Sequence, residues 1–98
     1  MKIEILDDAK EDLIAGHHFY EKQSPGLGSY FLNSLFADID SLLIHAGVHR
    51  VVDGSFRAIA SRFPFAIYYR VESDVVRVRA VIDCRRDPPW IRRRLRRG

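Results

Sequence analysis

The spacing of apolar residues changes halfway along the chain, and this change limits the possible fold more than any other feature. Up to about residue 46 the apolar residues recur every three or four positions, whereas from Phe56 onward they recur at every second position. The first spacing places side chains on one face of a helix, and the second places them on one face of a strand. The sequence therefore predicts helices first and a sheet afterwards.

The chain is predicted to begin with a short strand at residues 3–6 and a helix over about residues 8–23. Asp8 suits the N-cap of this helix, and Glu11 suits the third helical position as its capping-box partner. The Ser-Pro-Gly-Leu-Gly sequence at 24–28 ends the helix, because proline does not continue it and glycine permits a reversal. A turn is therefore expected there.

A second helix is predicted over about residues 29–46, where the apolar residues form one broad face. Gly47 suits the position just after a helix C-terminus, where a left-handed backbone is common. Since about five residues separate the two helices, we expect them to pack as an antiparallel hairpin.

The second half is predicted to form three consecutive strands, at residues 56–60, 65–71 and 76–82, with a turn at 72–74. A short helix beginning with Pro88-Pro89 is expected over 88–95. The predicted order β-α-α-β-β-β-α belongs to the α+β class, with an antiparallel sheet packed by a helical hairpin. The length of 98 residues suits a single domain over 1–98.

Arginines alternate with apolar residues in the last predicted strand. The apolar residues expected to share one face are Val76, Val78, Ala80 and Ile82. Arg77 and Arg79 are then expected on the opposite face, away from the helices. Arg57 and Arg70 would join them in a basic patch if the neighbouring strands present them to the same side, but the sequence does not fix the strand register.

Charge is divided unevenly between the two halves of the chain. Residues 1–49 carry three lysines and eight acidic residues, a net charge of −5, whereas residues 50–98 carry thirteen arginines and five acidic residues, a net charge of +8. Arginine forms forked hydrogen bonds with phosphate and carboxylate groups. The second half therefore favours an anionic partner, either nucleic acid or an acidic protein.

The remaining composition predicts an intracellular protein without a cofactor. Cys84 is the single cysteine, and no metal-ligand spacing surrounds it. No signal peptide is recognised at the start, and no stretch approaches the ~20 apolar residues of a membrane span. We therefore expect a cytoplasmic protein with no metal, no cofactor and no membrane contact.

Three segments resemble the RelE/ParE toxin superfamily of type II toxin–antitoxin systems, in the branch often called plasmid stabilisation proteins. They are YEKQSPGLGSYFLNSL, FRAIASRFPFAIYYRV and VRAVIDCRRDP, which together span most of the chain. The shared features are the Gly-Leu-Gly turn at 26–28, Arg-Phe-Pro at 62–64 with a tyrosine soon after, and an arginine pair before Asp-Pro at 85–88. The resemblance implies the same α+β fold that the periodicity predicts.

The resemblance also implies a toxin that a cognate acidic antitoxin binds and silences, as a hetero-oligomer. RelE-like members of the superfamily cut messenger RNA on the ribosome, whereas ParE-like members inhibit DNA gyrase without recognised catalysis. Cleavage needs groups that remove and supply protons as well as cations that stabilise the phosphorane. The sequence is rich in the cations, but it has no lysine beyond Lys22 and no histidine beyond His49.

Gyrase inhibition by binding is therefore the favoured prediction, with ribosome-dependent mRNA cleavage as the first alternative. An inactive toxin or a generic basic RNA-binding module is the second. Tyr68 is the possible acid or base of the cleaving alternative, together with Asp83, which stands where many relatives carry a histidine. The residues expected to bind target or antitoxin are Arg57, Arg62, Arg70, Arg77, Arg79, Arg85 and Arg86.

Overall fold

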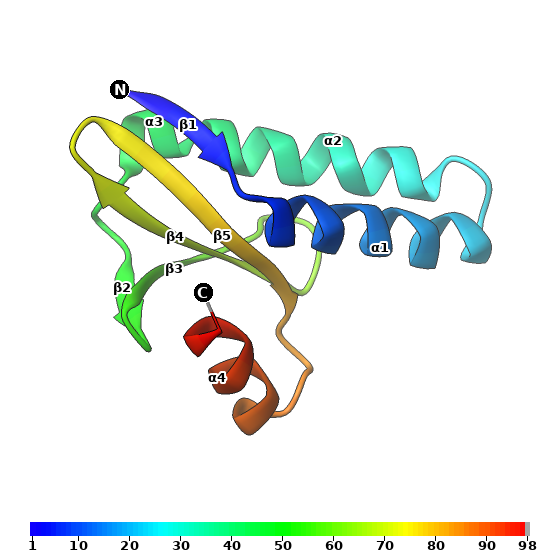
Figure 1. Ribbon diagram of the computed structural model, residues 1–98. Coiled ribbons are helices and arrows are strands. Elements are labelled where there is room, and N and C mark those ends of the chain that lie inside the picture. Colours follow the sequence, from blue (N-terminus) through cyan, green and yellow to red (C-terminus); the bar gives the residue numbers. More distant parts are fainter. Residues whose placement is uncertain (98) are drawn as a thin grey trace.

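A five-stranded sheet lies between a helical hairpin on one face and a single C-terminal helix on the other (Figure 1). The computed structural model describes residues 1–97. Its elements are β1 (Lys2–Ile5), α1 (Asp7–Gln23), α2 (Leu27–Asp40), α3 (Leu42–His45), β2 (Arg50–Val52), β3 (Ser55–Ile59), β4 (Phe65–Glu72), β5 (Val75–Asp83) and α4 (Pro88–Arg96). The predicted α+β fold with a helical hairpin on an antiparallel sheet is confirmed. No helix in the described part is both long and apolar enough to cross a membrane.

The strands lie in the order β1-β5-β4-β3-β2, and every neighbouring pair is antiparallel except β1 with β5. The edge strand β2 was not predicted. It pairs with β3 through a two-residue loop, Asp53-Gly54, in which both residues have positive φ angles of 49° and 82°. Asp-Gly is among the strongest sequence signals for such a hairpin, because its turn requires positive φ at both positions. The signal was therefore present in the sequence.

Two predicted helix limits are wrong. The N-cap of α1 is Leu6 rather than Asp8, so Asp8 lies within the first helical turn and no side chain caps the helix. The second helix is divided at Ser41, whose hydroxyl donates a hydrogen bond of 2.6 Å to the carbonyl oxygen of Asp38. Such local bonds compete with the regular helical pattern and bend it. Gly47 follows the shorter α3 with a φ of 91°, as predicted for its position.

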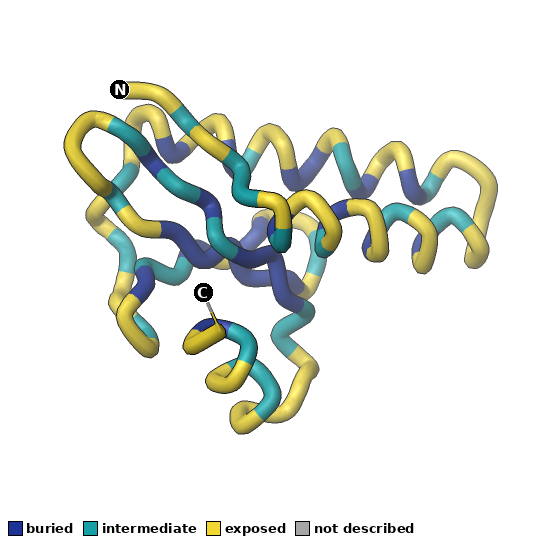
Figure 2. Tube along the Cα trace, viewed as in Figure 1, coloured by how far each residue is buried: buried dark blue, intermediate teal, exposed yellow. Residues whose placement is uncertain are grey.

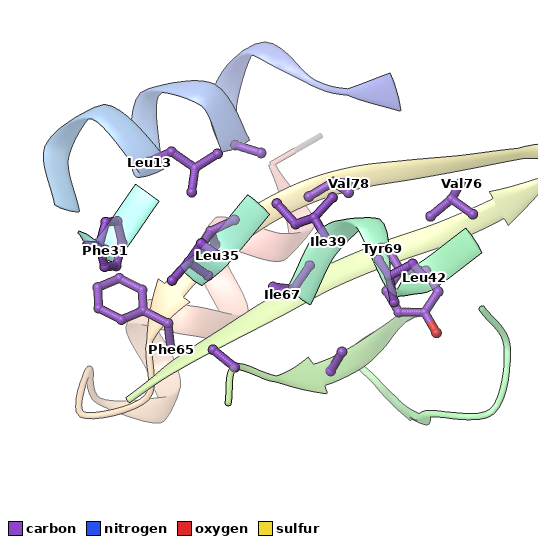
Figure 3. Close-up of a cluster of buried hydrophobic side chains, with 14 of the residues drawn as sticks. Leu13, Phe31, Leu35, Ile39, Leu42, Phe65, Ile67, Tyr69, Val76 and Val78 are labelled. Carbon is purple, nitrogen blue, oxygen red and sulfur yellow. The ribbon is translucent and has the colours of Figure 1, made fainter. Parts of the chain in front are cut away.

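The larger apolar core lies between the hairpin and the sheet. Figure 3 shows side chains from α1 and α2 meeting those of β4 and β5 in one layer. Its labelled members are Leu13, Phe31, Leu35, Ile39, Leu42, Phe65, Ile67, Tyr69, Val76 and Val78. Burial of an aliphatic side chain of this size contributes about 1.5–3 kcal/mol, so this layer supplies most of the drive to fold.

Two glycines lie where the helices of the hairpin pack against each other. A Cβ atom added to Gly16 would lie 2.5 Å from the ring of Phe31, and one added to Gly28 would lie 2.6 Å from the carbonyl oxygen of His17. Real Cβ contacts are longer than this, so neither position has room for a side chain. The glycines therefore set the separation between α1 and α2.

The first turn of α2 is held by a carboxylate of α1. Glu21 accepts hydrogen bonds from the backbone N–H groups of Gly26, at 3.0 Å, and Gly28, at 2.9 Å. These bonds lower the pKa of the Glu21 carboxyl. The free N–H groups of a helix N-terminus attract anions, and here the chain supplies its own.

A β-bulge in β5 overturns the predicted facing of this strand. Tyr69 pairs with Val78 and Tyr68 pairs with Ala80, so Arg79 has no partner opposite it on β4. The extra residue shifts the alternation by one position. As a result Val81 joins Val76 and Val78 in the larger core, whereas the other two residues predicted for that face, Ala80 and Ile82, lie in a second cluster.

The second cluster lies under α4, on the sheet face that was predicted to be exposed. Its buried members are Ala66, Tyr68, Ala80, Ile82 and Leu95. In Figure 2 partly or fully buried segments alternate with exposed segments along α4, as expected for a helix with one side on the sheet and the other side in solvent. The C-terminal helix therefore covers part of the arginine-bearing face.

We expect the substitution Gly16→Ala to lower the free energy of unfolding by about 2 kcal/mol, because the new methyl group overlaps the buried ring of Phe31. Alanine is about 1 kcal/mol better than glycine within a helix, so destabilisation requires that the clash outweigh this preference. Urea denaturation measures the change. In a Phe31→Leu background the smaller side chain leaves space, and the same substitution should then cost much less. An equal cost in both backgrounds would contradict this account of the contact.

Candidate binding surface

The strand register places the four predicted sheet arginines on one face. Arg57 lies opposite Tyr68 of the second cluster, and Arg70 lies directly opposite Arg77. Arg79, the bulge residue, reaches the carbonyl oxygen of Leu95 in α4, so it also points to the α4 side. The register that the sequence left open thus brings these side chains together on the same side of the sheet as the C-terminal helix.

Two of these arginines are tied to partners within the chain. Arg77 forms ion pairs with Glu4 of β1, at 2.8 Å, and Glu72 of β4, at 3.0 Å. Arg79 donates to the hydroxyl of Ser55, at 2.6 Å, and to the carbonyl oxygen of Leu95, at 2.7 Å. Arg79 therefore binds the free carbonyl end of α4, where a cation is favourable.

The other two sheet arginines, Arg57 and Arg70, form fewer contacts within the chain. Arg57 donates from Nε to the hydroxyl of Tyr68 at 3.2 Å, and Arg70 donates from Nε to the carbonyl oxygen of Gly54 at 3.2 Å. Arg70 is exposed and Arg57 is half-buried. The charge of Arg70 also acts on its neighbour Arg79: burial of Arg79 and this nearby charge together lower the pKa of the Arg79 guanidinium. Of the four, Arg70 is the most available to a partner.

The strongest ionic contact is one that the sequence did not reveal. Arg94 of α4 binds Asp12 of α1 with both guanidinium nitrogens, at 3.0 and 2.9 Å, and its side chain is only 7% exposed. The same carboxylate accepts the backbone N–H of Val81 at 2.9 Å. Burial raises the pKa of Asp12, and the hydrogen bonds from Arg94 and Val81 oppose that rise. Asp12 thus joins α1, β5 and α4.

The predicted proton-transfer residues are both engaged. Tyr68 is 2% exposed, and its hydroxyl accepts the hydrogen bond from Arg57. Asp83 accepts two hydrogen bonds from the guanidinium of Arg85, at 2.9 and 2.7 Å, and one from its backbone N–H at 2.8 Å. The bonds from Arg85 lower the pKa of Asp83. A carboxyl group with a lowered pKa is a weak base.

The two remaining predicted arginines are exposed. The guanidinium of Arg86 lies over the ring of Trp90, 4.2 Å from its centre. Arg62 lies in the loop between β3 and β4. Within the described residues, neither has a carboxylate within 4 Å.

An open cleft of about 380 Å³ lies between α1, the end of β5 and the start of α4. Its walls are largely apolar and include Phe19, which is exposed, and Trp90. Asp83 and Arg86 also line it. The cleft therefore combines an aromatic wall with polar groups that the sequence had singled out. Among residues 1–97 no group of three or more His, Cys, Asp or Glu side chains is placed to hold a metal ion.

Comparison with known proteins identifies the family. The family described as "ParE toxin of type II toxin-antitoxin system, parDE" matches residues 3–88. The chain belongs to the ParE toxin family. The resemblance to the RelE/ParE superfamily is thereby confirmed, and the matched segment runs from β1 to the first residue of α4.

The fold of this ParE-family chain also has a counterpart among solved structures. A structure described as "Chromosomal ParDE TA system from P. aeruginosa" superimposes with a TM-score of 0.77 and 18% sequence identity, and the match covers 85% of this chain and 95% of that chain. At this identity the likeness concerns the fold. No curated protein matches the chain.

We expect Asp12→Asn to lower the free energy of unfolding by about 3 kcal/mol, because it removes the carboxylate that binds both terminal nitrogens of the buried Arg94 guanidinium. The control is Asp8→Asn on the same helix. Asp8 pairs with exposed Arg97 at 3.2 Å and lies 4.0 Å from Nε of Arg94, and loss of such a partly exposed contact costs less than about 1 kcal/mol. Urea denaturation compares them, and similar losses in the two variants would show that the Asp12 pair is no stronger than a surface contact.

Substitutions of Arg77 and Arg79 are also expected to differ in their effect on the free energy of unfolding. Arg79→Ala removes the contact with the end of α4 and leaves the buried hydroxyl of Ser55 without a partner, so the loss should be about 2 kcal/mol. Arg77→Ala removes partly exposed ion pairs and should cost less than about 1 kcal/mol. Hydrogen exchange of the α4 amides should increase in the first variant only. Unchanged exchange in both would mean that Arg79 does not hold α4.

Proposed function

We propose that the chain is the toxin of a type II toxin–antitoxin pair, that an acidic antitoxin neutralises it, and that it inhibits DNA gyrase by binding. Membership of the ParE toxin family supports the toxin role. The ParE-like members that the sequence resembles are the gyrase inhibitors of the superfamily. The net charge of +8 over residues 50–98 suits an acidic antitoxin.

Engagement of both candidate proton-transfer groups is the observation that favours binding over RNA cleavage. Attack by a ribose 2′-hydroxyl needs a base that reaches that hydroxyl. Tyr68 is buried beneath α4, and Asp83 is held by Arg85 on three hydrogen bonds. A cleaving enzyme would have to release one of them before reaction. A binding inhibitor needs only an exposed surface.

The cleft beside Trp90 supports an antitoxin contact. An apolar side chain of the antitoxin would fit between Phe19 and Trp90, and a carboxylate near it would meet Arg86. Interfaces commonly combine one buried apolar anchor with a polar rim of this kind.

The predicted binding arginines contribute unequally in this proposal. Arg62, Arg70 and Arg86 are exposed and form no ion pair within the described residues, so they meet a partner without first breaking an ion pair. Arg77 and Arg85 would first exchange carboxylates of the chain for those of the partner. Arg57 and Arg79 act mainly from within, by fixing Tyr68 and α4.

Pulse labelling after induction in a bacterial host tests the target. DNA synthesis should fall first while protein synthesis continues for a time, and purified chain should inhibit supercoiling by gyrase. The substitution Tyr68→Phe keeps the buried ring and removes only the hydroxyl, so growth inhibition should stay within about twofold, whereas loss of a catalytic acid or base commonly costs 100-fold or more.

A different order of events would assign the other target. If protein synthesis stops first and Tyr68→Phe abolishes toxicity while the variant remains folded, the chain acts on messenger RNA. Immunity conferred by a short acidic protein encoded beside this gene would support the antitoxin separately from the target. If neither the unchanged chain nor the Tyr68→Phe variant inhibits growth, the toxin proposal is contradicted.

A further inference from the structure

The C-terminal helix α4 has two faces of different character. Ile91, Arg94 and Leu95 point inward, where they pack on the second cluster or bind Asp12. Arg92, Arg93 and Arg96 are exposed. At 3.6 residues per turn these three side chains span an arc of about 100° on the side away from the sheet. We call Arg92, Arg93 and Arg96 the outer arginines.

The outer arginines concentrate positive charge on one side of α4. Within residues 1–97 none of the three has a carboxylate within 4 Å. The acidic side chains that reach α4 are already occupied, because Asp12 binds Arg94 and Asp8 binds Arg97. Asp87 is exposed but stands before the first turn, at the other end of the helix. As far as residues 1–97 are concerned, the outer face therefore presents three guanidinium groups that form no ion pair.

The position of these groups is fixed from beneath. Arg94 is bound to α1, Arg97 is bound to Asp8, and the carbonyl oxygen of Leu95 is bound to Arg79. The helix is thus attached at its C-terminal half, where the outer arginines lie. A partner would meet an array whose backbone is already ordered, which lowers the entropic cost of binding.

The outer face lacks what a protein partner needs. A protein interface is built around a buried apolar or aromatic core, and the outer arc of α4 contains no large apolar side chain between the arginines. Binding to the nucleic-acid backbone needs only cations that neutralise phosphates. Arginine suits phosphate particularly well, because its planar fork donates two parallel hydrogen bonds.

The outer face offers phosphate-binding groups and few other features that recognise bases. Single-stranded RNA and DNA are bound largely by stacking of bases on exposed aromatic rings. Trp90 is the aromatic residue of α4, and its ring lies under the guanidinium of Arg86. Apart from its arginines, the helix also has no side chain that commonly reads the edge of a base, such as Asn, Gln, Ser or Thr. Duplex DNA offers the densest array of phosphates without requiring either feature.

We propose that the outer arginines of α4 bind the phosphate backbone of duplex DNA without regard to its sequence. This surface is distinct from the cleft beside Trp90, and the inference does not require gyrase to be the target. If gyrase is the target, the same helix would contact the DNA that the enzyme holds. The chain would then recognise a protein–DNA assembly through two different surfaces.

Fluorescence anisotropy of a labelled 30-base-pair duplex tests this proposal, with the full chain titrated at salt concentrations from about 50 to 200 mM. Three phosphate contacts predict a slope of about −2.7 for log K against log salt, which is about a 40-fold loss of affinity over this range. The variant Arg92→Ala/Arg93→Ala/Arg96→Ala should lose most of the binding and most of the slope. A scrambled duplex should bind equally well.

The control is matched in charge. The three lysines of the chain, Lys2, Lys10 and Lys22, are exposed on β1 and α1. Their replacement by alanine removes the same charge but should leave the affinity within about threefold, since long-range charge acts weakly at these salt concentrations. A second outer variant, Arg92→Gln/Arg93→Gln/Arg96→Gln, keeps a long polar side chain and a similar helix propensity at each position. It should fail to bind in the same way, which separates loss of charge from loss of folding.

Three results would overturn the proposal. Equal losses in the lysine and outer variants would mean that binding follows net charge alone. Poly-glutamate that competes with the duplex as well as unlabelled DNA does would indicate an acidic protein as the natural partner. Tighter binding of single-stranded RNA than of the duplex would show that the phosphate array of DNA is not what the helix fits. None of these outcomes depends on growth inhibition, so the toxin proposal is tested separately.

Discussion

A single carboxylate holds together the three layers of this structure. Asp12 lies on α1. Its two carboxylate oxygens accept hydrogen bonds from both terminal nitrogens of Arg94 and from the backbone N–H of Val81. The strand β1 pairs with β5 only as far as Val78, so beyond that point the edge of β5 would otherwise be unpaired. Asp12 supplies the missing acceptor and, through Arg94, fixes the C-terminal helix against the sheet. Both the cleft beside Trp90 and the outer arginines depend on this placement of α4.

The arginines of the second half serve two purposes that composition cannot separate. One group is directed inward and acts as structural ties: Arg77 between strands, Arg79 to the end of α4 and Arg94 to α1. The other group comprises Arg62, Arg70, Arg86 and the outer arginines, which are exposed and form no ion pair within the described part of the chain. These arginines are available for recognition. A row of guanidinium groups on a strand therefore does not by itself define a binding surface, because the chain's own carboxylates and carbonyl groups compete for it.

Periodicity was sufficient to predict the architecture, since each long element buries one face and its apolar spacing records that face. The hairpin β2–β3 was not predicted, because the short β2 has no periodic pattern of its own, but Asp53-Gly54 is a sequence signal from which it could have been predicted. Two features left no local trace. The bulge at Arg79 depends on how β4 and β5 pair, and the Asp12–Arg94 contact joins residues 82 positions apart. The candidate site was accordingly predicted less completely than the fold: the arginines were recognised, but their partners were not.

The bulge makes the effect of a deletion in β5 depend on where the deletion falls. On either side of Arg79 the strand serves two different layers, with Val78 and Val81 facing the hairpin and Ala80 and Ile82 facing α4. Apolar residues can replace one another here without altering which layer they serve. Removal of one residue between Val78 and Val81 would abolish the bulge and restore regular alternation, so Val81 would still face the hairpin with its N–H directed to Asp12. Removal of a residue elsewhere in the strand would instead reverse the facing on one side of the gap. The extra residue is therefore constrained by the contacts of Arg79 with Ser55 and Leu95 and not by the alternation of the strand.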